Sequence, residues 1–163
     1  MDLPKRRRVL NSFQIIVLGF AGVILLGALL LMLPVSSASG SATPFVNALF
    51  TSTTSVCVTG LVVYDTATYW SGFGHAVILV LIQIGGMGVV TVAASFAMIS
   101  GRKIGLFQRS TMQEAMAAPK MSGIVRLTNF IVRTTILIEL LGAAVMAPVF
   151  CRDFGVGRGL WMA

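Results

Sequence analysis

Residues 9–101 of this chain contain a single charged side chain, the carboxylate of Asp65. Soluble domains carry about 25% charged residues, whereas this 163-residue chain has 10% charged and 56% hydrophobic residues. Apolar runs of about 20 residues cross a bilayer as helices, because a helix satisfies its own backbone polar groups. The sequence therefore predicts an all-α membrane protein, bound to lipids rather than to nucleic acid.

Three segments are predicted to cross the membrane. They are residues 9–34, residues 70–100, and a third segment from about residue 127 to residue 150. The first is longer than the apolar core of a secretory signal, so we expect it to be retained. The third contains Arg133, expected to reach the cytoplasmic side, and Glu139, interpreted either as a structural hydrogen-bonding group or as a gating group.

The basic residues predict the orientation. The connection 35–69 contains no Lys or Arg, whereas basic residues flank the other ends of the predicted spans: Lys5, Arg6, Arg7, Arg8, Arg102, Lys103, Arg109, Lys120 and Arg126. Because Lys and Arg favour the cytoplasmic side, the N-terminus is predicted to be cytoplasmic. Arg152 and Arg158 then fall outside and are exceptions.

The connection between the first two spans is predicted to re-enter the membrane over residues 43–62. A short helix is expected over 44–55, with Thr43 as its N-cap and Pro44 at its first position. Its length is about 16 Å, or half a bilayer. The alternative is an extracellular loop with an interfacial helix.

An uncharged loop after a half-length helix suits a dehydrated cation. Backbone carbonyls can replace the water shell of the ion, and Gly60 permits the backbone angles that this requires. The C-terminal end of the preceding helix is partially negative and favours cations. Asp65 is interpreted either as a group that attracts cations at the outer mouth or as a solvated or capping carboxylate.

Three motifs together resemble one family. They are ALFTSTTSVCVTGLVVYDT (48–66), IQIGGMG (82–88) and GRKIGL (101–106). They are similar to the first pore unit of the Ktr/Trk/HKT potassium transporter superfamily, most closely to the bacterial Ktr B-type membrane subunit. The resemblance covers essentially the whole chain.

The resemblance implies a function and a set of partners. The filter would comprise Cys57, Val58, Thr59, Gly60 and Leu61, and the carbonyls of Val58, Thr59 and Gly60 would hold potassium as the transported substrate, with no bound cofactor. It also implies multi-pass insertion in the bacterial plasma (inner) membrane, a dimer, and a cytoplasmic nucleotide-binding regulatory subunit.

An internal repeat extends the resemblance, because the family has four pore units in one chain. LGALLLMLPV (26–35) aligns with LGAAVMAPV (141–149) with one gap. Residues 1–103 are therefore assigned to a first helix–pore-helix–filter–helix unit and residues 104–123 to a cytoplasmic connection. Residues 124–163 would hold the first helix of a second unit and the start of its pore helix, so we expect the chain to be the N-terminal part of a transporter.

The remaining candidates are weaker. Gly85, Gly86 and Gly88 are interpreted as helix-packing residues or as a hinge, and His75 as a capping or interfacial residue. Cys57 and Cys151 are not expected to form a disulfide, and no catalytic or metal-binding constellation is visible, so the chain is not predicted to be an enzyme. Two other functions stay open: a small channel that assembles from copies of residues 9–100, and a non-conducting membrane anchor.

Overall fold

The computed structural model describes residues 11–99, 105–116, 123–154 and 157. Among these residues the regular structure consists of seven α-helices and one short 3-10 helix, with no strand. The prediction of an all-α membrane protein is therefore confirmed. The chain forms two compact units, Met1–Ile124 and Val125–Ala163, which are described separately. The basic residues at 5–8, 102, 103 and 120, on which much of the predicted orientation rests, lie outside the described residues.

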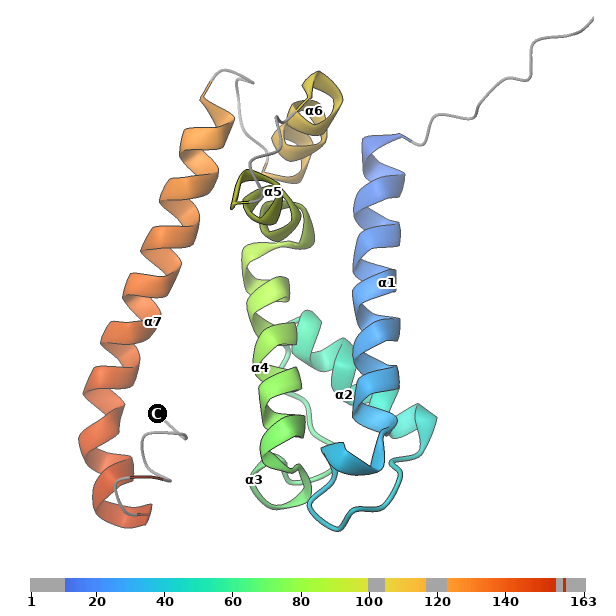
Figure 1. Ribbon diagram of the computed structural model, residues 1–163, viewed down its shortest axis with the longest axis vertical. Coiled ribbons are helices and arrows are strands. Elements are labelled where there is room, and N and C mark those ends of the chain that lie inside the picture. Colours follow the sequence, from blue (N-terminus) through green and yellow to red (C-terminus); the bar gives the residue numbers. More distant parts are fainter. Residues whose placement is uncertain (1–10, 100–104, 117–122, 155–156, 158–163) are drawn as a thin grey trace, which may run out of the picture. The chain divides into compact units, whose positions relative to one another are not determined.

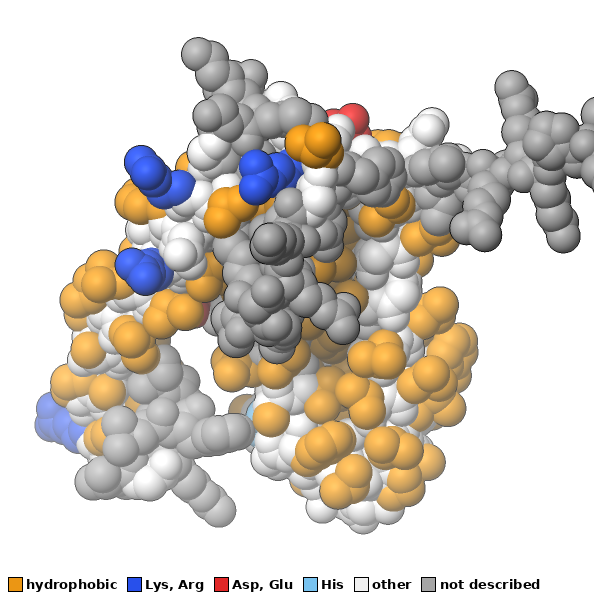
Figure 2. All heavy atoms as spheres, turned by 45° about the horizontal axis from the view of Figure 1, so that its top comes forward, with side chains coloured by type: hydrophobic (Ala, Val, Ile, Leu, Met, Phe, Trp, Pro, Cys, Tyr) orange, Lys and Arg blue, Asp and Glu red, His pale blue; other side chains and the backbone are white. Residues whose placement is uncertain are grey.

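Helix α1 (Ser12–Met32) is long enough to cross the membrane. Its 21 uncharged residues span about 31 Å, close to the thickness of the hydrocarbon core. It ends at Leu33, whose extended backbone (ψ 140°) is the conformation favoured before proline, here Pro34. On the right of Figure 2, the surface is largely covered with hydrophobic side chains. Leu26 and Leu29 of α1 are among the exposed hydrophobic residues of the chain.

Helix α2 (Phe45–Val56) packs against both α1 and α4 (Gly72–Met87), and the three helices form the centre of the first unit (Figure 1). Its start differs from the prediction. Pro44 occupies the N-cap position and makes no side-chain cap bond. Thr43 is not the cap, because its buried hydroxyl is instead paired with the Tyr69 hydroxyl at 3.1 Å.

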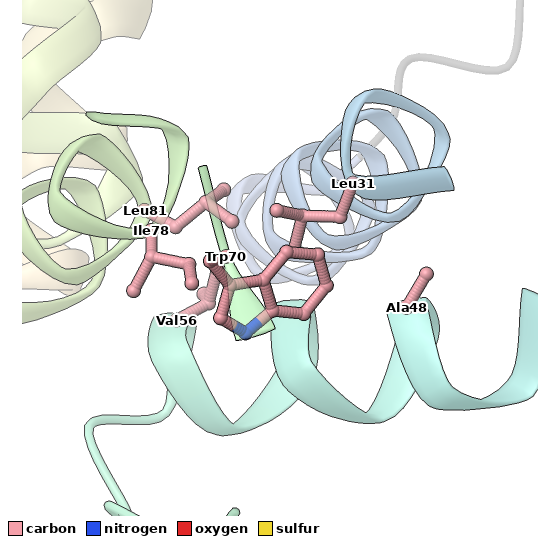
Figure 3. Packing of buried hydrophobic residues seen from close by; sticks show 6 residues of the cluster. All are labelled: Leu31, Ala48, Val56, Trp70, Ile78 and Leu81. Carbon is pink, nitrogen blue, oxygen red and sulfur yellow. The ribbon is translucent and has the colours of Figure 1, made fainter. Parts of the chain in front are cut away.

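The core of this unit is small and centred on Trp70. The indole is 3% exposed and lies among side chains from α1, α2 and α4 (Figure 3). The residues that surround it are Leu31, Ala48, Val56, Ile78 and Leu81. Trp70 also pairs with Ser37 in an isolated antiparallel bridge, so the two ends of the connection between α1 and α4 are held together.

Close approach of the helices depends on two glycines. A Cβ atom on Gly27 of α1 would lie 2.5 Å from the Ser52 hydroxyl oxygen and 2.7 Å from Leu81. The absence of a side chain there allows Ser52 to donate to the Ile24 carbonyl of α1 at 2.7 Å. On the other side of α2, a Cβ atom on Gly85 would lie 2.0 Å from the Val56 carbonyl oxygen.

The predicted span 70–100 is not one continuous helix, and its crossing of the membrane stays a prediction. The chain forms the single-turn α3 (Thr66–Tyr69), then α4, and then α5 (Val89–Ile99). Helices α4 and α5 are bent by 99° at Gly88. The cause is the positive φ of Gly88, +84°, since a right-handed helix cannot continue through a left-handed residue.

Helix α5 turns toward α1, and Val89 Cγ1 lies 3.1 Å from where a Cβ atom on Gly19 would be. Helix α6 (Leu106–Ala115) contacts both α1 and α5. In the described part of the chain, two helices are long and apolar enough to cross a membrane, or three if the bent pair α4–α5 counts as one span.

The second unit is formed by the long helix α7 (Ile124–Phe154). Pro148 lies inside α7, whereas the corresponding Pro34 of the aligned sequence follows the end of α1. Arg133 and Glu139 are both exposed on this helix. The expected start of a second pore helix after residue 154 lies almost entirely outside the described residues.

The two adjacent glycines of α4 give a test of this packing. We expect Gly85→Ala to lower the free energy of unfolding by about 1–3 kcal/mol, because the new methyl group would overlap the backbone of α2. Gly86→Ala is the matched control, since nothing lies within 4 Å of its Cβ position. Thermal unfolding of the detergent-solubilised protein measures both changes, and equal effects would contradict the proposed contact.

Candidate ion-binding site

The loop 57–61 begins where α2 ends, and its N–H groups turn back to that helix. The N–H of Cys57 donates to the Thr53 carbonyl at 2.8 Å, that of Val58 to Ser55 at 3.2 Å, and that of Thr59 to Thr54 at 3.0 Å. These bonds satisfy the carbonyls that a helix C-terminus leaves without partners. The N–H of Leu61 also donates to α2, to the Thr54 hydroxyl at 2.9 Å.

The backbone of the loop alternates in the sign of φ. Val58 has φ +53° and Gly60 has φ +73°, and Thr59 between them is not in the positive region. Such alternation turns successive peptide groups to the same side, whereas a strand turns them to opposite sides. A β-branched residue at positive φ is a strained conformation that costs about 1–3 kcal/mol and is found mainly at functional sites.

The carbonyl groups of the loop are unpaired. No hydrogen bond within the described residues is accepted by the carbonyl oxygen of Val58, Thr59 or Gly60. Val58 is 57% exposed and Leu61 is 60% exposed, and space is open beside Gly60. A backbone carbonyl without a partner in the chain needs one from outside it, such as water or an ion. The loop leaves three consecutive carbonyls available to such a partner.

The loop has no charged group of its own. Residues 57–64 are uncharged, and the C-terminal, partially negative end of α2 adjoins them. Asp65 caps α3: its carboxylate accepts from the Ala67 N–H at 3.4 Å and from the Thr68 hydroxyl at 2.7 Å. This is the geometry of the capping alternative, so the carboxylate is at least partly engaged within the chain.

A cavity of about 290 Å³ lies between α2, α4 and the loop. Thr51 and Thr54 line it from α2, and Ile78 and Ile82 line it from α4. Gly60 and Tyr64 contribute from the loop side. The loop therefore stands away from α4 along part of its length, and its position depends on contacts with α2.

The other candidate residues from the sequence lie in different places in the structure. Gly85 packs against α2, Gly86 faces open space, and Gly88 bends the chain. His75 contacts the first residue of α3, with its Nε2 atom 2.7 Å from the Thr66 carbonyl oxygen. Arg133 and Glu139 belong to the second unit.

Metal ligation by side chains receives no support. Across the described ranges, no group of three His, Cys, Asp or Glu side chains is placed to hold an ion.

Sequence analysis missed three polar side chains that contact the loop or continue from it. Thr54, Asn47 and Tyr64 are joined to one another or to the loop by hydrogen bonds. Their types gave no signal because each is common in helices and loops. The spacing of seven residues between Asn47 and Thr54, two turns of one helix face, is the clue that was available.

The fold defines a membrane protein with a re-entrant-sized helix and an uncharged loop of free carbonyls, and comparison with known sequences agrees with that class. Residues 3–161 match the TrkH family of cation transport proteins, and the chain belongs to this family. It is a transport family rather than an enzyme family.

Individual relatives are similar over most of the chain. The potassium/sodium uptake protein NtpJ of Enterococcus hirae is 39% identical over 165 residues, which cover 100% of this chain and 37% of the relative. The Ktr system potassium uptake protein B of Bacillus subtilis is 40% identical, covering 91% of this chain and 33% of the relative. The protein of the same name from Vibrio alginolyticus is 34% identical, covering 92% and 32%. The chain thus spans about a third of the length of these relatives.

The backbone of Gly60 can be tested without reference to transport. We expect Gly60→Val to destabilise the protein by about 1–3 kcal/mol more than Gly60→Asn, because Asn tolerates a left-handed backbone and a β-branched residue does not. Both side chains have open space, so the comparison isolates the backbone. Thermal unfolding in detergent measures the difference; equal stability would contradict the positive φ.

Proposed function

We propose that this chain supplies the first carbonyl filter of a potassium uptake protein. Potassium would move down its electrochemical gradient and would be held by the carbonyl oxygens of Val58, Thr59 and Gly60, flanked by Cys57 and Leu61. The observation that carries the proposal is the run of three unpaired carbonyls with alternating φ at the end of α2. Carbonyl oxygens replace the water shell of a monovalent cation without adding a fixed charge.

The names of the relatives support the choice of ion. Two of them are potassium uptake proteins by name and a third is a potassium/sodium uptake protein. In this proposal four such loops surround one pore, of which residues 1–103 form the first unit and residues 124–163 begin the second. Asp65 would lie at the outer mouth.

The remaining assignments follow from the same proposal. The protein would lie in the bacterial inner membrane with a cytoplasmic N-terminus, residues 104–123 would form a cytoplasmic connection, and a dimer would bind a cytoplasmic nucleotide-binding subunit. The basic side chain of Arg109 in α6 supports a cytoplasmic position for that helix.

Growth of bacteria that lack potassium uptake tests the filter. The chain would be expressed alone, and also joined to the remaining two thirds of the Bacillus subtilis relative. We expect rescue at low potassium by the joined protein, and loss of rescue with Gly60→Ser or Gly60→Asp, because Ser disfavours the positive φ of Gly60 and Asp adds a charge that would hold the ion too strongly. Gly86→Ser, in open space on α4, is the matched control.

The outcomes separate the candidate functions. Rescue by the chain alone would indicate a self-assembling channel. Uptake that is unchanged in both Gly60 variants would contradict the proposed filter.

The position of the loop can be tested through Cys57. Cys57 is exposed and adjoins the three carbonyls, and Cys151 is the other cysteine of the chain. In the joined protein with Cys151→Ser and any cysteines of the added segment replaced, we expect a membrane-impermeant thiol reagent added outside the cell to block potassium uptake. Potassium should slow the reaction, and Cys57→Ser should abolish it. Modification from the cytoplasmic side only would contradict the predicted orientation.

A further inference from the structure

We propose that α2 positions the filter through two side-chain anchors on one helix face, Thr54 and Asn47, and that the Thr54 hydroxyl sets the ion selectivity of this loop. This inference rests on the proposed function, because it assigns a role to the side chains behind the carbonyls. Neither residue contacts the ion. Both are positioning residues that act through the backbone of the loop.

Thr54, the inner anchor, makes three hydrogen bonds with the loop. Its hydroxyl oxygen accepts from the N–H of Leu61 at 2.9 Å and is paired with the hydroxyl of Thr59 at 2.5 Å. Its carbonyl accepts from the N–H of Thr59 at 3.0 Å. One residue of α2 therefore binds the loop on both sides of Gly60, the residue at which the backbone is most free to rotate.

Asn47 holds the outer anchor. Its Nδ2 amide donates to the hydroxyl of Tyr64 at 2.5 Å. The Tyr64 ring is stacked on Tyr69, with ring centroids 3.9 Å apart, and the Tyr69 hydroxyl is paired with Thr43 just before α2. The segment that follows the filter is thus fixed to the start of the same helix.

The two anchors match in position and in length. Asn47 and Thr54 are seven residues apart, which is two helical turns, so they share a face of α2 and are separated by about 10 Å along its axis. The loop residues that they hold, Leu61 and Tyr64, are three residues apart and can span up to about 10 Å. The segment after the filter is therefore held to this face of α2 at two points.

The cavity explains why these anchors matter. Ile78 and Ile82 of α4 face the loop across the cavity of about 290 Å³ and offer it no polar group. Movement of the loop into the cavity, toward α4, is therefore opposed by its hydrogen bonds to α2 and not by packing against α4. Because discrimination between potassium and smaller cations depends on the positions of the carbonyls, a loop released from Thr54 would close around a smaller ion.

The helix supplies a matched control residue. Thr53 adjoins Thr54, but its hydroxyl donates only to the Leu49 carbonyl of the same helix at 2.7 Å. Thr54→Val removes the hydroxyl with little change of shape, Thr54→Ser retains it, and Thr53→Val makes the same change beside it. Tyr64→Phe removes the outer anchor and leaves the stacked ring.

The experiment measures potassium, rubidium and sodium uptake by the joined protein described above, in cells that lack other uptake systems and at matched membrane abundance. We expect Thr54→Val to lower the potassium/sodium uptake ratio about tenfold, because the bonds of its hydroxyl to the Leu61 N–H and to the Thr59 hydroxyl are lost. Thr54→Ser should restore most of the ratio, Tyr64→Phe should lower it by a smaller factor, and Thr53→Val should leave it unchanged.

The outcomes identify which statement fails. An unchanged ratio in both Thr54→Val and Tyr64→Phe, while Gly60→Asp abolishes uptake, overturns the anchors and leaves the filter intact. An equal fall in Thr53→Val and Thr54→Val also overturns the anchors, since it reports general damage to α2. Unchanged uptake in Gly60→Asp overturns the proposed function itself. If Thr54→Val does not reach the membrane, the ratio in Tyr64→Phe decides the question.

Discussion

The hydrogen-bonding requirement of the peptide backbone governs this structure. Within a bilayer a backbone polar group must find a partner in the protein or face water, and the first unit meets this demand mainly with helices. The tight connections follow the same rule: the Ser71 N–H donates to the Ser36 carbonyl at 2.9 Å, and the Ala38 N–H donates to Tyr69 at 2.9 Å. Within the described residues, the carbonyls of Val58, Thr59 and Gly60 accept no hydrogen bond from the chain, and in the proposed function potassium takes that place.

Small residues carry the helix packing because apolar side chains gain little from leaving lipid for protein. Gly27 and Gly85 allow α2 to lie close to α1 and α4 respectively. The Ser52 hydroxyl then reaches a carbonyl of α1. The half-length helix is thereby held on two sides, which gives the uncharged loop at its end a fixed base.

The sequence was sufficient for the helical class, the first span and the half-length helix, because charge and apolar length determine them. It failed for local geometry. Thr43 looks like an N-cap, but a distant partner, Tyr69, takes its hydroxyl. For Gly85, Gly86 and Gly88 the sequence left helix packing and a hinge both open, and only the φ of +84° places the bend at Gly88. The hydrogen-bonded partners Asn47 and Tyr64 are 17 residues apart, and no short-range sequence pattern predicts such a pair.

The bend at Gly88 has a consequence for the surrounding lipid. Helix α4 has 16 residues before the bend and reaches about 24 Å, which is shorter than a hydrocarbon core of about 30 Å. An apolar helix that falls short of the bilayer thickness draws the headgroups toward it or admits water to its end. The membrane beside α4 should therefore be locally thin, and thicker bilayers would place the junction of α4 and α5 under mechanical load.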